Sequence, residues 1–324
     1  MKTPRFWYDD TVHIPLWTRV LAPVYAALRL LHTHITTPIR PSVRTICIGN
    51  ITAGGSGKTP LIKTLVPYLP VPGTVILTRG YKGREKGPLI VQLDQHTAAD
   101  VGDEAIELAR GTRIPVVVSK DRRKGIDWII AHLAPKIVLM DDGLQNPSIK
   151  PHINIAVIDG KMGFGNERLI PAGPLREHLN HVWPRLDSVI IVGDDVRHIT
   201  SDVPRHIPVF SASAQTDIST LDPAKPAIAF AGIGWPDKFF DQLQGQGIDV
   251  VHTFSFPDHH TYTKDDIDMI LKTAEEKGAQ IVTTEKDAVK LPEAYLNHIH
   301  ALPLHLSIKE ISALVSRILG NKEE

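Results

Sequence analysis

Apolar residues near the start of the chain recur every three or four positions, and they predict an amphipathic helix over residues 13–34. The stripe consists of Leu16, Trp17, Val20, Leu21, Val24, Tyr25, Leu28 and Leu31. Tryptophan and tyrosine with arginines nearby are typical of a helix that lies on a lipid surface. The same stripe also fits a helix that packs on the protein's own core. The pattern alone leaves both interpretations open.

From residue 43 onward, short apolar runs alternate with segments of helical periodicity. The apolar runs predict strands at residues 43–48, 74–77, 114–119, 137–140, 153–158 and 189–192. Helices are predicted between them at residues 60–69, 103–110 and 121–133. Such alternation indicates a parallel sheet that is covered by helices on both faces.

Proline, serine, threonine and aspartate accumulate between residues 203 and 226 and predict a domain boundary there. The alternation then resumes, with strands at 227–231, 250–254 and 280–284 and helices at 238–244, 264–277 and 307–319. A chain of 324 residues also exceeds what one hydrophobic core usually serves. We therefore expect an N-terminal helix in residues 1–36, a large α/β domain in 37–203 and a smaller α/β domain in 204–324.

Composition narrows the possible functions. Basic and acidic residues number 36 each, so the net charge is zero and a general nucleic-acid binder is disfavoured. Cys47 is the single cysteine and rules out an intramolecular disulfide, and its apolar neighbours predict a buried side chain. No stretch of about 20 residues is free of charge, so we expect no membrane-spanning helix.

The first predicted strand runs into a glycine-rich loop and then a helix, which is the context of a phosphate-binding P-loop. In such loops successive backbone N–H groups point at phosphate oxygens, and the helix N-terminus attracts the anion. Lys58 would reach the β- and γ-phosphates of ATP, and Thr59 would place its hydroxyl on Mg²⁺. Thr52 stands where the general pattern has its first glycine. The predicted nucleotide-binding residues are Thr52, Ala53, Gly54, Gly55, Ser56, Gly57, Lys58 and Thr59.

A P-loop needs an acidic residue at the end of a nearby strand to hold Mg²⁺. The apolar run 137–140 ends at Asp141 and Asp142, which fit that role, although an Asp-Asp-Gly turn in solvent has the same sequence. Adjacent side chains at a strand end point to opposite sides, so we expect one of the two to face the metal.

Three further segments are candidates for handling the acceptor. Asp103 precedes a helix and suits either a general base or a helix N-cap. Residues 256–262 carry Asp258, His259 and His260, which suit proton transfer but also an ordinary polar loop. Residues 168–177 combine prolines with Arg168 and Arg176, whose guanidinium groups suit a phosphorylated acceptor or a structural turn.

Together these segments resemble the tetraacyldisaccharide 4′-kinases of the lipid A pathway. The matching segments run in order over nearly the whole chain, and Thr52 fits the loop of this family. They are residues 49–60, 78–81, 102–104, 141–145, 168–177, 258–260 and 284–287.

The resemblance implies a P-loop NTPase-like domain, a second smaller α/β domain and an N-terminal membrane-associated helix. It implies ATP-dependent phosphorylation of the 4′-hydroxyl of a tetraacyl glucosamine disaccharide 1-phosphate, which gives lipid IVA. By the same resemblance, Asp103 acts as the base and pairs with a histidine, for which we choose His259 over His260. Thr59, Asp141 and Asp142 would hold Mg²⁺, and Lys58 and Asp142 would act in catalysis.

The resemblance also changes the interpretation of the N-terminal helix. A substrate with four acyl chains does not leave a bilayer readily, because each buried CH₂ contributes about 0.8 kcal/mol. We therefore expect the helix at residues 13–34 to lie on a membrane. We further expect a monomer at the cytoplasmic face of the bacterial inner membrane, with the lipid substrate and the membrane surface as partners and no nucleic acid.

Overall fold

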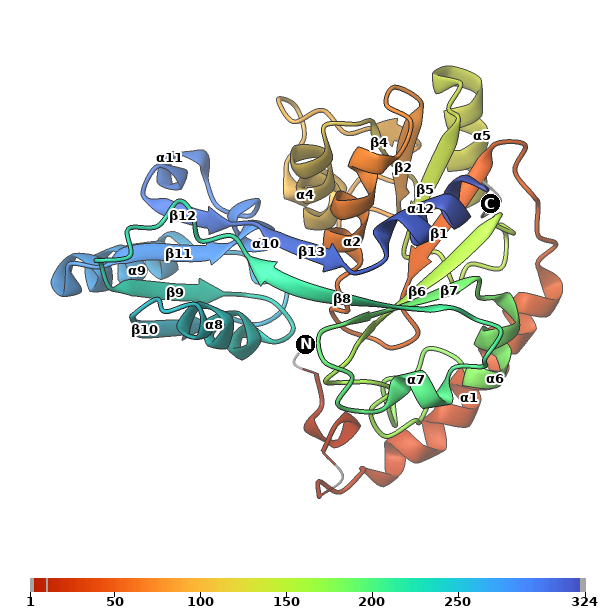
Figure 1. Ribbon diagram of the computed structural model, residues 1–324, viewed down its shortest axis with the longest axis horizontal. Coiled ribbons are helices and arrows are strands. Elements are labelled where there is room, and N and C mark those ends of the chain that lie inside the picture. Colours follow the sequence, from red (N-terminus) through yellow and green to blue (C-terminus); the bar gives the residue numbers. More distant parts are fainter. Residues whose placement is uncertain (1–2, 10, 321–324) are drawn as a thin grey trace.

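A computed structural model describes residues 3–9 and 11–320 of the chain. Two sheets, rather than one, organise these residues, and they lie side by side (Figure 1). The large sheet has nine strands in the order β13-β8-β7-β6-β1-β5-β2-β4-β3, and the small sheet has four in the order β10-β9-β11-β12. Mostly parallel pairing confirms the α/β fold that the alternation predicted.

The central strands of the large sheet are apolar runs that are buried on both faces. Its strands are β1 (Arg44–Gly49), β2 (Thr74–Thr78), β3 (Leu89–Ile90), β4 (Val116–Val118), β5 (Ile137–Asp141), β6 (Ile153–Asp159), β7 (Ser188–Val192), β8 (Val209–Thr216) and β13 (Leu304–Ile308). Only the edge pairs β13–β8 and β3–β4 are antiparallel. Strand β1 lies between β5 and β6, so the segment that follows β1 emerges at the centre of the sheet.

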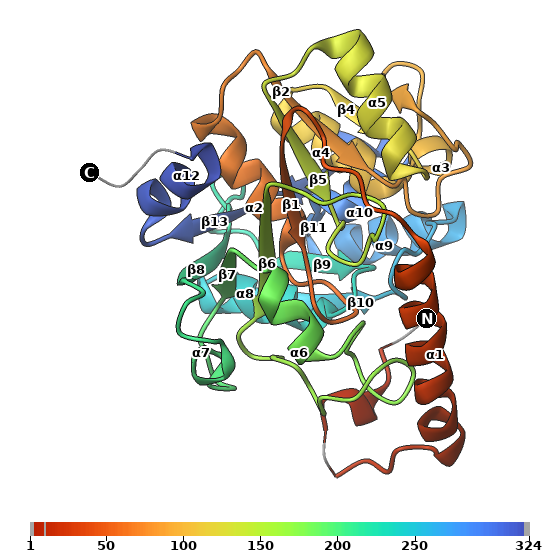
Figure 2. The same cartoon turned by 90° about the vertical axis from the view of Figure 1, so that its right-hand side faces the viewer.

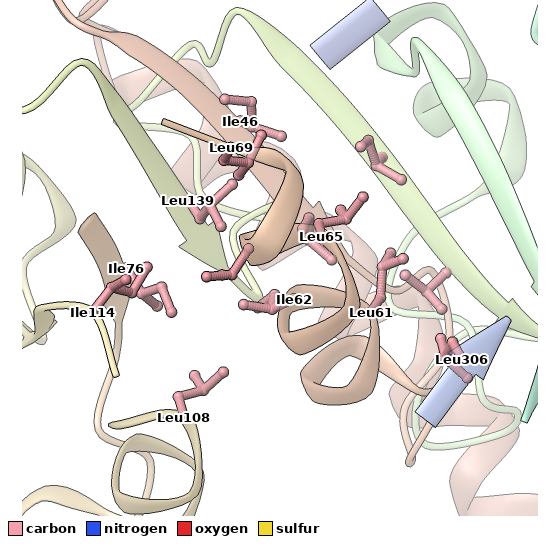
Figure 3. Close-up of a cluster of buried hydrophobic side chains, with 14 of the residues drawn as sticks. Ile46, Leu61, Ile62, Leu65, Leu69, Ile76, Leu108, Ile114, Leu139 and Leu306 are labelled. Atoms are coloured by element: carbon pink, nitrogen blue, oxygen red, sulfur yellow. The ribbon is translucent and has the colours of Figure 1, made fainter. Parts of the chain in front are cut away.

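Helices cover both faces of the large sheet. One face is covered by α2 (Lys58–Leu65), α4 (Asp103–Thr112) and α12 (Ile311–Leu319), whose apolar residues form one core with the strands (Figure 3). Figure 3 shows Leu61, Ile62 and Leu65 of α2 directed at this core, with Leu306 of β13 beside the helix. The opposite face carries α5 (Arg122–Leu133), α6 (Leu179–Val182) and α7 (Ile199–Asp202) over a second core. Shorter elements are α3 (Ala98–Val101) and the 3-10 turns η1 (Arg5–Trp7), η2 (Val66–Tyr68) and η3 (Trp183–Arg185).

The small sheet is entirely parallel and has its own cores on its two faces. Its strands are β9 (Ala227–Ala231), β10 (Val250–Ser255), β11 (Gln280–Thr284) and β12 (Ile299–Leu302). Its helices are α8 (Pro236–Gly245), α9 (Lys264–Lys277), α10 (Glu285–Ala288) and α11 (Glu293–Leu296).

Four strands were not predicted: β3, β8, β12 and β13. The last three change the interpretation of two segments. Residues 203–226 were interpreted as a boundary, yet β8 lies within them. The strand was missed because its residues alternate between buried and exposed instead of forming an apolar run. The C-terminal helix was predicted from residue 307, but strands β12 and β13 precede it and the helix begins at Ile311. The chain therefore crosses between the sheets twice, after β8 and before β13, whereas the predicted division is drawn once at residue 204.

The nine-stranded sheet with its covering helices is the large unit, and the four-stranded sheet with its helices is the small unit. The N-terminal helix α1 (Leu16–Ile35) lies along the outside of the large unit (Figure 2). Its inner face packs Ala22, Tyr25 and Ala26 against the core beneath it. Its remaining large apolar side chains face outward, and Leu16, Val20 and Leu28 each expose more than 60% of their surface. Among the described residues, no helix combines the length and apolar character needed to cross a bilayer.

Candidate active site

The glycine-rich loop follows β1 and ends where α2 begins, at Lys58. Gly54 and Gly57 have φ angles of 122° and 93°, a backbone conformation that residues with a side chain rarely adopt. The Asn50 side-chain amide donates to the Gly54 carbonyl at 2.9 Å, and the Ala53 N–H donates to the Pro174 carbonyl at 2.8 Å. The loop is therefore held in shape from both sides, with the N-terminus of α2 at its end.

The predicted nucleotide-binding residues share this loop but differ in exposure. Gly54 and Gly55 are exposed, whereas Thr52 and Ser56 are buried. Within the described part of the chain, the Ser56 hydroxyl is buried without a hydrogen-bond partner. Lys58 is mostly buried, with its Nζ 3.9 Å from Oδ1 of Asp142. A buried hydroxyl and an ammonium beside exposed backbone suit an anionic ligand.

The carboxylates of Asp141 and Asp142 lie beside this loop, because the strand register pairs Ile48 of β1 with Asp141 of β5. Oδ2 of Asp141 accepts from the Thr78 hydroxyl at 3.0 Å, while its Oδ1 is buried and has no partner among the described residues. Burial, reinforced by the charge of Glu104, raises the pKa of Asp141 to about 7. Arg122 fixes this strand end from behind by donating to the Asp141 carbonyl at 2.5 Å.

Asp142 has a different environment from its neighbour. Its two oxygens accept from the Arg176 guanidinium at 2.8 and 2.9 Å. Burial acts to raise the pKa of Asp142, but the charges of Lys58 and Arg176 outweigh it and lower this pKa to about 2. The two adjacent carboxylates therefore differ: the charge of Asp142 is offset by cations of the protein, whereas Asp141 has one buried oxygen without a partner among the described residues.

These residues fit a magnesium ion bound with ATP. Such an ion is held by one or two protein ligands together with substrate phosphates, and not by a cage of side chains. Within residues 3–9 and 11–320, no three His, Cys, Asp or Glu side chains group closely enough to form such a cage. The unpartnered Oδ1 of Asp141 and the half-buried Thr59 at the start of α2 match the smaller requirement.

Arg176 belongs to the segment 168–177, which connects the phosphate loop to α1. The Tyr25 hydroxyl of α1 donates to the Arg176 carbonyl at 3.0 Å. The next residue, Glu177, is buried and accepts from Arg29 of α1 at 2.9 Å and from Arg185 at 2.6 Å. The other predicted arginine of this segment, Arg168, is exposed. The inner face of α1 is thus anchored to the segment that holds Asp142.

The acceptor candidates come from different sheets, and the structure brings two of them together. Asp103 begins α4 on the large sheet, and His259 follows β10 on the small sheet. Nδ1 of His259 lies 2.7 Å from Oδ2 of Asp103, and both side chains are nearly buried. Burial acts to raise the pKa of Asp103, but the hydrogen bond with His259 and the charge of Lys286 lower it.

The neighbouring histidine points elsewhere. Nε2 of His260 lies 3.0 Å from Oδ2 of Asp266, which caps α9, and its ring stacks on Phe256. Asp258 lies 3.7 Å from Nε2 of His259 and 3.4 Å from Nζ of Lys286. Of the two candidate histidines, only His259 therefore lies against Asp103.

Several residues beside the phosphate loop were not predicted. Tyr8, Asp159 and Trp235 line a narrow pocket against the loop, with room for about one water molecule. Tyr8 packs edge-on against Trp235 of the small unit, and Asp159 pairs with Lys238 at 2.5 Å across the two units. The position of Asp159 at the end of β6 was a usable signal, because strand ends on this side carry the other site residues.

A family model described as tetraacyldisaccharide-1-P 4′-kinase, LpxK, matches residues 16–321. The chain belongs to this family. Tetraacyldisaccharide 4′-kinase of Gluconacetobacter diazotrophicus is 42% identical over 313 residues, covering 95% of this chain and 94% of the relative. The corresponding kinase of Parvibaculum lavamentivorans is 40% identical and covers 91% and 88%.

A solved structure agrees with these relatives. The LpxK of Aquifex aeolicus, determined in complex with ATP, superimposes with a TM-score of 0.76 at 26% identity. The match covers 93% of this chain and 97% of that one. As a tetraacyldisaccharide 4′-kinase, the protein carries out ATP-dependent phosphorylation at the 4′ position in lipid A biosynthesis. The resemblance stated from the sequence motifs is confirmed.

Proposed function

We propose that the 4′-hydroxyl is deprotonated by Asp103, with His259 hydrogen-bonded to it, while the loop 52–59 holds the phosphates of ATP. The observation that carries this proposal is the 2.7 Å contact between Asp103 and His259, which joins the two units. Glu104, which follows Asp103 in α4, also lies near enough to the end of β5 for its charge to add to the burial that raises the pKa of Asp141. A base and a phosphate site therefore share one region.

The individual roles follow from the environments of the side chains. Asp103 has a lowered pKa, so it is ionised near neutral pH and able to accept a proton. His259 holds this carboxylate in place through Nδ1, and Tyr81 packs against its ring at 5.5 Å. Lys58 offsets the charge of the transferred phosphate, and Arg176 and Lys58 hold Asp142 beside it.

Mg²⁺ would be held by Thr59 and by Asp141, whose buried Oδ1 lacks a partner in the described structure. Asp142 was predicted as a second ligand, and its ion pair with Arg176 gives it a supporting position. The ion supplies charge neutralisation for the β- and γ-phosphates.

A paired substitution tests the base. We expect Asp103→Asn to lower the turnover of γ-labelled ATP with the tetraacyl disaccharide 1-phosphate by about 10²- to 10⁴-fold, because the amide is not a base. ATP affinity should stay within about twofold, since the loss falls on the transition state. Asp266→Asn is the matched control, because Asp266 contacts the other histidine. Equal turnover of the two variants would remove Asp103 from this role.

We also propose that the outward face of α1 docks on the cytoplasmic face of the inner membrane. Trp17, Val20, Val24, Leu28 and Leu31 each expose half or more of their surface on one helix. A contiguous exposed apolar surface of this kind marks an interaction site. The acyl chains of the substrate lie in a bilayer, so a docked helix brings the site to them.

Vesicle sedimentation tests this docking. We expect Val24→Gln with Leu28→Gln to lower recovery on phosphatidylethanolamine–phosphatidylglycerol vesicles several-fold while the melting temperature stays unchanged. Val196→Gln removes a similarly exposed apolar side chain outside α1 and serves as the control. Wild-type recovery of the α1 variant would contradict the docking surface.

A further inference from the structure

A buried ionic cluster outside the substrate contacts joins three elements of the protein. Lys63 of α2 places its Nζ 3.1 Å from Oε1 of Glu107 on α4 and 2.6 Å from Oε2 of Glu285 on α10. The side chains of Lys63 and Glu107 are only 12% and 9% exposed, and that of Glu285 is 29% exposed. One ammonium thus bridges two helices of the large unit and one helix of the small unit.

The surrounding structure makes room for this ammonium. A Cβ added at Gly111 of α4 would collide with Cε of Lys63, so a larger residue there would displace the lysine. Burial raises the pKa of Glu107, and the charge of Lys63 opposes that effect. Buried charges of this kind are seldom more stabilising than apolar residues of similar size, so stability alone does not explain the cluster.

Each of the three elements also carries a group of the proposed site. Helix α2 begins with Lys58 and Thr59, about one turn before Lys63. Helix α4 begins with Asp103, one turn before Glu107. In α10, Lys286 follows Glu285 and pairs with Asp258, the residue that precedes His259.

We propose that Lys63 is a positioning residue that sets the phosphate-binding helix, the base and His259 in register across the two units. This inference rests on the proposed roles of Asp103 and His259. Without the ammonium, the carboxylates of Glu107 and Glu285 would face each other without a cation between them, because Lys63 alone contacts both among the described residues. Their repulsion would push α10 away from α4 and lengthen the contact between His259 and Asp103.

The test compares Lys63→Met with Lys272→Met, which removes an exposed lysine of α9. We expect Lys63→Met to lower kcat for phosphate transfer about tenfold or more, with the ATP dissociation constant within twofold. Glu285→Gln added to Lys63→Met should restore part of the loss, because it removes the repulsion. A merely structural lysine would lower the melting temperature without this recovery.

Asp103→Asn run in parallel separates the two proposals. Near-normal turnover of Asp103→Asn would overturn the base assignment itself. If that variant is slow but Lys63→Met matches Lys272→Met, the positioning role is overturned while the base stands. In the Asp103→Asn background, Lys63→Met should cause little further loss, and a fully multiplied loss would also overturn the inference.

A milder variant keeps the test decisive if Lys63→Met does not fold. Glu285→Gln alone removes one arm at the more exposed end of the cluster. We expect it to lower kcat about threefold at unchanged ATP affinity. Wild-type kcat in this variant would contradict the proposal.

Discussion

The two halves of the site are built in different ways. The phosphate half is contiguous, since its loop and helix occupy residues 49–65, directly after β1. The carboxylates of Asp141 and Asp142 lie at the end of the adjacent strand, β5. The acceptor half joins Asp103 and His259, which are 156 residues apart and belong to different sheets. The phosphate half is therefore fixed locally, while the acceptor half depends on how the two units are placed. Substitutions in the phosphate half should act by removing contacts. Substitutions in the acceptor half should act in the same way and also by shifting one unit relative to the other.

The largest effect is expected in the phosphate half. Lys58→Met removes the ammonium beside Asp142, the group that we propose to face the phosphates of ATP. We expect turnover to fall about 10³-fold and ATP affinity to fall with it, because this contact exists before and during transfer. Equilibrium binding of ATP and phosphate transfer should be measured side by side. Unchanged ATP affinity would place Lys58 away from the nucleotide.

The acceptor half should lose turnover without losing ATP. His259→Gln removes the contact with Asp103, and we expect kcat to fall about 10²-fold. His260→Gln is the matched control, because its ring contacts Asp266 and Phe256 instead. We expect its kcat to stay within about twofold of wild type, and the reverse order of the two variants would contradict the assignment.

The pH dependence of kcat tests the pairing of Asp103 with His259 in the acceptor half. The pKa of Asp103 is lowered, so this base stays ionised until the pH falls below the usual aspartate value of about 4. Activity is therefore present above the pKa of Asp103 and is lost as the pH falls through it. His259→Gln removes the hydrogen bond that lowers this pKa, and we expect the acid limb of the kcat profile to move to higher pH. An acid limb at the same pH in both proteins would contradict the link.

The smallest effect is expected where α1 meets the phosphate half. Arg29→Met breaks the ion pair with buried Glu177 next to Arg176, and we expect kcat to fall about threefold. Arg19→Met removes an exposed arginine of the same helix, so it controls for charge near a lipid surface. Equal kcat values of the two variants would show that the inner face of α1 does not influence the site.

The sequence was sufficient to locate the elements of the contiguous half. A strand, a glycine-rich loop and a helix have short-range signals, and the structure places them at residues 44–65 close to where they were predicted. Asp141 and Asp142 became candidates because an apolar strand ends at them, but their different environments depend on Thr78 and Arg176.

The rest depended on tertiary structure. Strand β8 alternates serine and alanine with few large apolar residues, so it lacks the continuous run of a buried strand. Lys63, Glu107 and Glu285 come from three separate helices, and no spacing along the chain connects them. The choice between His259 and His260 likewise required knowing which ring faces Asp103.

The central claim is that Asp103 and His259 act as one unit across the two sheets. It is tested most directly by a double-mutant cycle of Asp103→Asn and His259→Gln, measured as phosphate transfer from γ-labelled ATP to the tetraacyl disaccharide 1-phosphate. If the residues act together, the turnover of the double variant should lie within about twofold of the turnover of the slower single variant. If the two losses multiply instead, the residues act independently and the proposed pairing is contradicted.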